Sequence, residues 1–536
     1  MMLKSFLCVF LSVTVICGLF SVIIVPFGLA QGGLVTFITS DTVWTKAESP
    51  YNLTGTVVVS TGVTLTLSPG VTVNLNGYTI FVNGTLHAVG SASENILLSG
   101  GEVSYGDNDQ TGLNSIFEYT VINSTVSSSK PLKLNNNTIN VGVTVGANSV
   151  ISNNVVLAAI NAGDNTTVSN NDIKADLSVG DSSTISYNTI NADVTAGSSA
   201  KILSNTINGS SIYFMAFGGH GYTIALTVGA LSEISNNTIS GGVTATSSTI
   251  SNNTISGGAP FTDWAGRPED STSAVEVSGD SSITFNVISS STGGYGVLIR
   301  NGYTYVSGNV IQNRIRVAGD ALIEENLIYN GGIQVGHIFI SAYNDIDYGY
   351  GDSIIRNNVI MNNSIGISSN REDGTAIIEQ NLISNNTYGI SVTSQVTILN
   401  NTITDSTVAI SLGTSSVIMA YNNILNYTQN SLILSEVSTA VNATYNWWGT
   451  TDTQAINLTI RDFKYDITLG TVTFVPMLTA QNPQAPSTSF SLPMPPMTPT
   501  TVIPEFPSLT LLAVFLVVTS FLVVVKKRVL HQTQRH

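Results

Sequence analysis

The sequence predicts an all-β protein whose main part is a parallel β-helix, a solenoid of roughly 16 to 20 coils. The pattern Asn-x-Ile recurs along the chain, and its most frequent spacing is 17 residues. β-branched residues, glycine and asparagine dominate each copy, which excludes a helical solenoid. A unit of this size cannot bury its own apolar face, so neighbouring copies must share one core. An array of β-sandwich domains, the closest alternative, would need longer domain periods than this uniform step.

Each copy places an asparagine between two apolar positions. The residue two positions after the asparagine is Ile except at Val156, and the residue three positions before it is always aliphatic. Apolar positions five residues apart fit neither a helix nor one alternating strand, but they fit two short strands that meet at a sharp bend. Asn tolerates the left-handed conformation that this bend requires, and its amide can bond to the asparagines of adjacent coils. The expected structural ladder consists of Asn137, Asn154, Asn171, Asn188, Asn205, Asn237, Asn253, Asn286, Asn309, Asn326, Asn358, Asn381, Asn401 and Asn422.

The N-terminal segment predicts export. Residues 1–30 combine Lys4, an apolar run over residues 5–29 and small residues at the end, as in a secretory signal peptide. The alternative is an uncleaved N-terminal anchor, because the apolar run is longer than in most signals. Both cysteines, Cys8 and Cys17, lie in this segment, so the exported chain has no disulfide and no thiolate metal site.

The predicted ectodomain is residues 31–480, and from about residue 40 to residue 480 it resembles the right-handed parallel β-helix surface proteins of archaea and bacteria. The resemblance rests on the opening strands between residues 44 and 101, on the Asn-Trp-Trp-Gly motif at 446–449 and on residues 469–476. It implies a right-handed coil and a place on the cell surface. It does not identify a substrate, because this family includes polysaccharide lyases, epimerases, adhesins and a periplasmic copper-insertion protein.

The C-terminal segments predict a membrane anchor. Residues 481–503 are a Pro/Ser/Thr-rich stalk, too rich in proline for a packed element. Residues 504–528 contain Pro-Glu-Phe-Pro, an apolar run over 509–525 that just reaches the length of a membrane span, and a basic stop before a cytoplasmic tail, 529–536. This order resembles the C-terminal sorting signals of archaeal surface proteins, in which a lipid anchor replaces the helix. A permanent single-pass helix is the alternative, and either form predicts a cell-surface location.

Charge and composition restrict the partners. The formal net charge is −15, and residues 31–508 hold all 33 acidic residues but only 13 of the 18 basic ones. Such a surface repels nucleic acid and anionic lipid. The ectodomain also contains 14 Asn-x-Ser/Thr sequons, which predict glycosylation of an exported protein. Many of these sequons lie in a repeated Asn-Asn-Thr-Ile motif, so the alternative is that their asparagines serve the fold.

Coils longer than 17 residues must form loops, and three such loops combine aromatic and charged residues. Aromatic faces for sugar rings, with a few carboxylates and an arginine, are typical of a glycan-binding strip. The alternative is that these residues are loop plugs and solvated charges. The candidates for glycan contact are Tyr213, Tyr222, Trp264, Arg267, Tyr348 and Tyr350.

A polysaccharide lyase or epimerase of this fold would need Ca²⁺-binding carboxylates and a base that removes a proton from the sugar. Asp345, Asp347 and Asp352 could supply the oxygens, and Arg371 or His337 could be the base. The negative charge of the ectodomain works against a polyanionic substrate, except in a locally basic cleft. Calcium is therefore expected only if the protein is a lyase.

A glycoside hydrolase would need two carboxylates about 5–10 Å apart, for which Asp263 with Glu269 or Asp270 is the candidate pair. A copper site would need clustered Cys, Met or His, which the coil region lacks. We therefore expect a membrane-anchored structural or adhesive protein without a cofactor, which contacts polysaccharide along one loop-bearing face. A surface polysaccharide lyase or glycoside hydrolase is the alternative.

Overall fold

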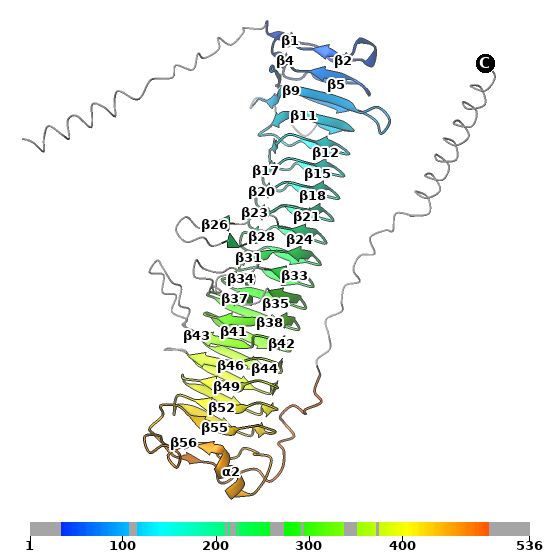
Figure 1. The fold of residues 1–536 in the computed structure, drawn as a ribbon. Coiled ribbons are helices and arrows are strands. Elements are labelled where there is room, and N and C mark those ends of the chain that lie inside the picture. The colour runs from blue at the N-terminus through cyan, green and yellow to red at the C-terminus, as the bar shows by residue number, and fades with distance from the viewer. Residues whose placement is uncertain are drawn as a thin grey trace, which may run out of the picture. The chain divides into compact units, whose positions relative to one another are not determined.

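The computed structural model describes residues 34–106, 115–209, 213–214, 221–222, 224–257, 273–290, 294–336, 351–370 and 375–491. The chain divides into two compact units, residues 1–145 and 146–536. Each unit consists of short parallel strands stacked coil upon coil (Figure 1). The expected signal peptide, sorting motif, anchor and cytoplasmic tail lie outside the described residues. Within the described part of the chain, no helix is long and apolar enough to span a bilayer.

The first unit contains two main rows of parallel strands, β1–β4–β7–β9–β11 and β2–β5–β8–β10–β12. Its elements are β1 (Thr36–Ile38), β2 (Thr42–Trp44), the 3-10 helix η1 (Lys46–Glu48), β3 (Tyr51–Asn52), β4 (Val57–Val59), β5 (Thr64–Leu67), β6 (Thr72–Asn74), β7 (Thr79–Val82), β8 (Thr85–Val89), β9 (Ile96–Tyr105), β10 (Ile116–Glu118), β11 (Thr120–Ser127), β12 (Lys133–Asn135), β13 (Thr138–Ile139) and β14 (Val143–Val145).

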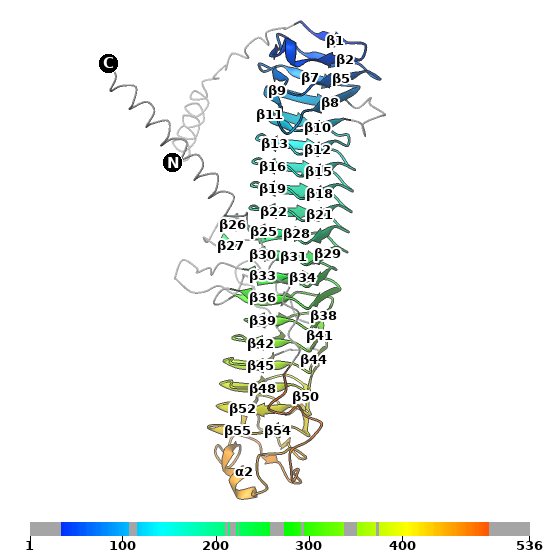
Figure 2. The same ribbon diagram turned by 90° about the vertical axis from the view of Figure 1, so that its right-hand side faces the viewer.

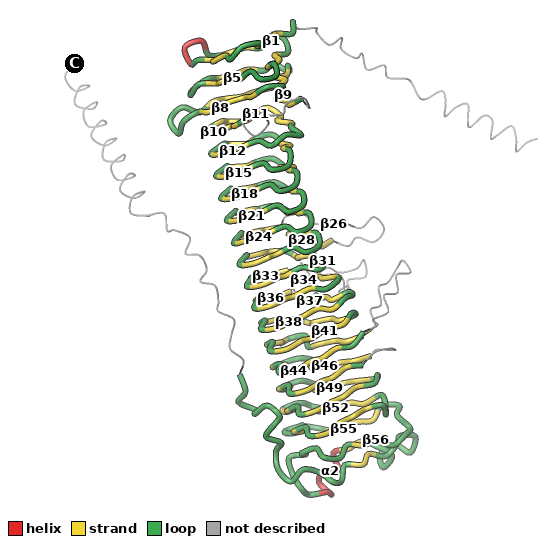
Figure 3. Tube along the Cα trace, turned by 180° about the vertical axis from the view of Figure 1, so that it is seen from behind, coloured by secondary structure: helices red, strands yellow, loops and turns green. Residues whose placement is uncertain are grey.

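Three rows of strands build the second unit, and we call them faces 1, 2 and 3. Face 1 precedes the repeated asparagine, face 2 follows it directly, and face 3 completes the coil; Figure 2 shows face 2 beside face 1, and Figure 3 shows the turns between the rows. Face 1 consists of β15 (Val150–Ser152), β18 (Thr167–Ser169), β21 (Thr184–Ser186), β24 (Lys201–Leu203), β29 (Glu233–Ser235), β32 (Thr249–Ser251), β35 (Ser281–Thr284), β38 (Tyr303–Ser307), β41 (Asp320–Glu324), β44 (Ser353–Arg356), β47 (Ala376–Glu379), β50 (Val396–Leu399) and β53 (Val417–Ala420).

Face 2 consists of β16 (Val155–Val156), β19 (Asp172–Ile173), β22 (Thr189–Ile190), β25 (Thr206–Asn208), β30 (Thr238–Ser240), β33 (Thr254–Gly257), β36 (Val287–Ser290), β39 (Val310–Gln312), β42 (Leu327–Tyr329), β45 (Val359–Met361), β48 (Leu382–Ser384), β51 (Thr402–Thr404) and β54 (Asn423–Ile424). Face 3 consists of β17 (Ile160–Ala162), β20 (Leu177–Val179), β23 (Val194–Ala196), β28 (Ile224–Val228), β31 (Gly242–Thr246), β34 (Ser273–Ser278), β37 (Tyr295–Ile299), β40 (Arg314–Val317), β43 (Ile333–Gly336), β46 (Ile365–Asn370), β49 (Tyr388–Val392), β52 (Val408–Leu412) and β55 (Asn430–Leu434).

The parallel register explains the apolar spacing of the repeat. Val168 pairs with Ile185 on face 1, and Ile173 pairs with Ile190 on face 2, so like residues stack from coil to coil. These side chains are fully buried, and burying each contributes about 1.5–3 kcal/mol. Face 1 and the equivalent row of the first unit contain 18 strands in the described segments, which fits the expected number of coils.

The left-handed bend is made by the residue before the repeated asparagine, not by the asparagine itself. Asn170 (φ 56°) and Tyr187 (φ 57°) directly precede Asn171 and Asn188, and none of the ladder asparagines has a positive φ. The prediction that the repeated asparagine adopts this conformation is therefore wrong by one residue. The reason is that the asparagine must point into the coil to bond, whereas the corner residue points to solvent and only has to tolerate the strain.

The C-terminal end of the second unit is closed by its last elements. These are α2 (Thr453–Thr459), β56 (Val441–Asn442), β57 (Ile460–Arg461) and β58 (Val472–Thr473). The carboxylate of Asp452 caps α2 by accepting hydrogen bonds from two backbone N–H groups of its first turn. Trp448 is buried and meets Phe474 edge-on at 6.3 Å, so the expected closing motif covers the core of the last coil.

The segment after the cap turns back onto the coils. Asn482 and Ala485 are buried, and the backbone N–H of Asn482 donates to the side chain of Asn423 at 2.7 Å. We call residues 482–486 the C-terminal strap. This packing differs from the expected stalk, because Asn423 of β54 and Asn400 at the corner supply hydrogen-bond partners that a proline-rich segment does not have by itself.

Candidate functional site

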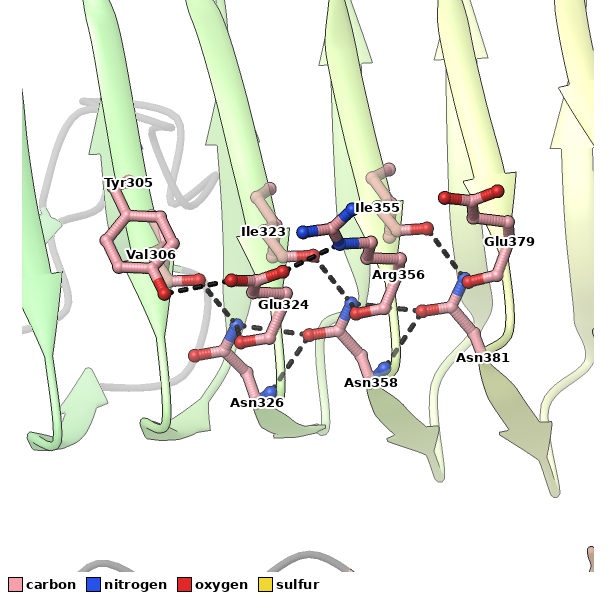
Figure 4. A network of polar contacts seen from close by, with 10 residues as sticks. All are labelled: Tyr305, Val306, Ile323, Glu324, Asn326, Ile355, Arg356, Asn358, Glu379 and Asn381. Carbon is pink, nitrogen blue, oxygen red and sulfur yellow. Dashed lines mark hydrogen bonds and ion pairs between the residues drawn. The ribbon is translucent and has the colours of Figure 1, made fainter. Parts of the chain in front are cut away.

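The repeated asparagines form one buried row inside the coils. The N–H and Nδ2 of Asn171 both donate to Oδ1 of Asn188 at 2.9 Å, and Nδ2 also donates to the carbonyls of Ile151 and Ser169. The N–H bond repeats at every such asparagine from Asn154 to Asn422, and Figure 4 shows it from Asn326 to Asn358 and from Asn358 to Asn381. The polar groups of this row are thus used within the wall of the coil.

A second buried row, of serine and threonine hydroxyls, is absent from the sequence-based expectations. It lies five positions before the asparagine: Thr166 donates its N–H to Oγ of Ser183, and Ser232 donates to Oγ of Ser248, each at 3.1 Å. Its signal in the sequence is a small hydroxyl residue at a fixed offset from the asparagine. Alanine also occurs at this position, at residue 200, so the signal is weaker than that of the asparagine.

Most of the predicted site residues lie outside the described segments. Of Tyr213 and Tyr222, only the backbone is described: they pair in the antiparallel strands β26 (Tyr213–Phe214) and β27 (Gly221–Tyr222). The candidates outside the described residues are Asp263, Trp264, Arg267, Glu269, Asp270, His337, Asp345, Asp347, Tyr348, Tyr350 and Arg371.

Asp352 is the one predicted carboxylate whose contacts are described. Its Oδ1 accepts hydrogen bonds from the N–H and the hydroxyl of Thr375, each at 2.8 Å, and its own N–H donates to Oδ1 of Asp320. Asp164 and Asp181 in the regular coils accept from the next coil in the same way. Asp352 therefore links neighbouring coils through hydrogen bonds. Among the described residues, no group of three or more His, Cys, Asp or Glu side chains could hold a metal ion.

The outward column of face 3 changes its chemistry within the second unit. Strand pairing aligns Ser178, Thr195, Thr227, Thr244, Glu276, Leu298, Arg316, Gln334, Ser368, Ser391 and Ser411. The ends of this column are small hydroxyl residues, whereas the four members from β34 to β43 are large. The core does not constrain these outward positions, so they can vary between coils. Over four coils they have become large side chains, most of them polar or charged.

Two arginines, Arg300 and Arg314, lie beside these four positions, and a third, Arg316, is one of the four. Nε of Arg300 donates to Oε1 of Glu276 at 2.5 Å, and Nη1 of Arg314 donates to Oε1 of Gln334 at 3.2 Å. Arg314 is exposed, and the side chain of Arg300 is one-third exposed. These planar donor groups match the carboxylate and hydroxyl groups of acidic sugars.

Arg316 has a different role from Arg314. It is only 5% exposed, its Nη1 donates to the hydroxyl of Tyr295 at 2.6 Å, and its guanidinium lies 5.5 Å from the centre of that ring. Tyr295 is buried together with Leu298 and Ala318. Arg316 thus supports the wall beneath the exposed groups.

Face 1 of the same coils carries a second charged network, shown in Figure 4. Glu324 accepts a hydrogen bond from the hydroxyl of Tyr305 at 2.8 Å and one from Nε of Arg356 at 2.7 Å. The bond to Glu324 raises the pKa of Arg356. A hydrogen bond with Ser307 lowers the pKa of Tyr305, but its burial and its bond to Glu324 outweigh this effect, so that the pKa is raised.

The insertions of the second unit all adjoin face 3. The segments outside the described residues follow β25, β33 and β36, directly before face 3 strands, or follow β43 and β46, directly after them. The three loops predicted from the sequence fall on these connections. Face 3 between β34 and β43 is therefore the loop-bearing face on which the described polar groups gather, and we call it the arginine face.

The comparisons with known proteins agree with the fold. A family model described as a right-handed β-helix region matches residues 242–397, which include the arginine face. The curated proteins with which the chain was compared gave no match. The coils thus form a right-handed parallel β-helix, as the resemblance implied.

Proposed function

We propose that this right-handed parallel β-helix protein is an adhesive or structural protein of the cell surface that binds acidic polysaccharide through its arginine face. The observation that carries the proposal is that glutamate, leucine, arginine and glutamine replace a Ser/Thr column over four adjacent coils, with the more exposed Arg300 and Arg314 beside this column. Export and anchoring are inferred from residues 1–30 and 504–528, with either a retained helix or a lipid as the anchor.

The ligand class follows from the groups that are exposed. A guanidinium binds a carboxylate in a planar, charge-assisted geometry, and the amide of Gln334 and the carboxylate of Glu276 suit sugar hydroxyls. Adjacent coils repeat these groups about 4.8 Å apart, so an extended polymer can bridge several coils. The local arginines also offset the repulsion of a polyanion by a chain of net charge −15.

The test compares Arg314→Ala with Lys201→Ala, which removes an equal charge from face 1 of a regular coil. The full-length protein in detergent is applied to an array of acidic and neutral polysaccharides. Because a charge-assisted hydrogen bond contributes about 1.5–3 kcal/mol, Arg314→Ala should weaken binding about tenfold or more. Lys201→Ala should leave binding unchanged.

Two results would contradict this proposal. Equal binding of polysaccharide by both variants would show that the arginine face is not the binding site. Depolymerisation of the polysaccharide would identify the protein as an enzyme. In the second case, loss of cleavage in Asp263→Ala would favour a hydrolase. Loss in Asp347→Ala together with a Ca²⁺ requirement would favour a lyase.

A further inference from the structure

Four copies of one tetrapeptide occur in different surroundings of the fold. Asn-Asn-Thr-Ile begins at Asn136 in the first unit and at Asn236, Asn252 and Asn400 in the second. Each copy is an N-glycosylation sequon whose acceptor is the first asparagine. Because the four residues are identical, a difference in modification between the copies must come from their flanking sequence or from the fold.

The fold and the sequon use different asparagines. In the copy at Asn236, the acceptor is the left-handed corner residue (φ 59°), Asn237 is the buried ladder residue, Thr238 faces outward and Ile239 lies in the core. The same assignment holds at Asn252 and Asn400, whose φ values are both 55°. The ladder asparagine and the acceptor asparagine are thus different residues. The hydrogen bonds of the ladder therefore do not block modification of the acceptor, whereas the alternative drawn from the sequence assigned both asparagines to the fold.

The copies at Asn236 and Asn252 present their sequon to solvent. Asn236, Thr238 and Thr254 are exposed, and Asn252 is partly exposed. Within the described residues, no hydrogen bond involves the side chains of these four residues. A glycosylating enzyme needs both the acceptor amide and the sequon hydroxyl, and both are accessible here.

The C-terminal strap covers the copy at Asn400. Thr402 is 1% exposed and its hydroxyl donates to the carbonyl of Pro486 at 2.5 Å. Oδ1 of Asn400 accepts a hydrogen bond from Nδ2 of Asn482 at 2.9 Å. Nδ2 of Asn482 also donates to the carbonyl of Tyr421 at 2.6 Å, which fixes the strap across two coils.

We infer that folding selects among these identical sequons: Asn236 and Asn252 are N-glycan acceptors, and the C-terminal strap excludes Asn400. The accepted sites lie on the corner between faces 1 and 2. A glycan there leaves the arginine face of the proposed function open. The inference does not depend on what that face binds.

The test uses the full-length chain, produced in a host without N-glycosylation and purified in detergent. A purified single-subunit oligosaccharyltransferase with a lipid-linked glycan is added, and glycopeptide mass spectrometry measures the occupancy of each site. We expect Asn236 and Asn252 to be modified, and Asn400 to be modified at least about tenfold more slowly, because the strap must first open locally. Short peptides that contain each copy with its flanking residues should all react at similar rates.

A pair of strap variants separates protection by the strap from other effects. Asn482→Ala combined with Ala485→Asp removes the corner contacts and buries a charge, so the strap should detach and Asn400 should react as fast as Asn236. Pro483→Ala changes an exposed strap residue and should keep Asn400 protected. The inference is overturned if Asn400 reacts as fast as Asn236 in the unmodified chain, or if Asn236 and Asn252 do not react while their peptides do. Because the glycosylation reaction is carried out on purified protein, its outcome does not depend on polysaccharide binding or on the location of the protein in the cell.

Discussion

The coils between Val150 and Asn208 advance by 17 residues and expose mainly small polar side chains, whereas most of those between Ser273 and Glu379 are longer and carry most of the described arginines. Both regions contain the same asparagine row, with N–H to Oδ1 distances of 2.8–3.0 Å. Their interiors are thus equivalent while their exteriors differ. A parallel β-helix therefore separates stability, which the interior supplies, from recognition, which the exterior can acquire coil by coil.

Breaking the asparagine row should have the largest effect and should affect both regions alike. Asn188→Ala and Asn358→Ala each remove a buried acceptor of two hydrogen bonds and a donor to the carbonyls of the coil. Each should lower the free energy of unfolding by about 2–4 kcal/mol, measured by urea denaturation followed by circular dichroism.

The partly exposed Asn191 provides the control for this pair, because its Oδ1 accepts a surface hydrogen bond from Asn208. Asn191→Ala should change the free energy of unfolding by less than about 0.5 kcal/mol. A loss at Asn188 without a comparable loss at Asn358 would contradict the equivalence of the two interiors.

Removing a hydroxyl from the second row should have a smaller effect. Ser183→Ala and Ser248→Ala leave the N–H groups of Thr166 and Ser232 without this acceptor. The free energy of unfolding should fall by about 0.5–1.5 kcal/mol in the same denaturation experiment. Ser178→Ala, on the outward column of face 3, should not change the free energy of unfolding measurably. Equal decreases for Ser178→Ala and Ser183→Ala would show that the buried hydrogen bond does not contribute to stability.

Loss of a charged side chain from the exterior should change the free energy of unfolding in the longer coils but not in the regular ones. Arg356→Met removes the partner of Glu324, whose side chain is 14% exposed, and should cost about 1 kcal/mol or less because Arg356 itself is more than one-third exposed. Lys201→Met changes the same charge on face 1 of a regular coil and should be neutral. Adding Glu324→Gln to Arg356→Met should recover part of the loss, and a double variant no more stable than Arg356→Met would contradict the ion pair.

The smallest expected effect is in the titration of Tyr305. Its folded pKa is raised above 10.0, so the stabilisation by this group is complete below the unfolded pKa and is lost as the pH rises through the folded pKa. The difference in tyrosinate absorbance between the unmodified chain and Tyr305→Phe should therefore have its midpoint above pH 10. In a Glu324→Gln background the midpoint should move down, and an unchanged midpoint would exclude Glu324 as a cause.

Sequence periodicity predicted the stacked coils because identical coils need identical inward residues. The spacing of Ile185 and Ile190 around Asn188 specifies two strands and a bend, and the parallel register repeats this geometry. Which residue is left-handed could not be read from the same pattern, because Asn, Ser, Tyr and Glu all occupy the corner. Those residues share only an outward side chain, and the backbone conformation comes from the chain reversal around them.

The sequence by itself determined the repeat, the all-β coils and the buried asparagine row, because the same local pattern recurs at nearly every step. Only the tertiary structure decided which outward residues meet. Glu276 and Arg300, or Glu324 and Arg356, lie a coil apart in sequence and become neighbours through strand pairing across insertions of variable length. It also decided that Pro486 reaches Thr402, over 84 residues. Contacts of this kind depend on how far the chain travels between coils, and no local pattern encodes that distance.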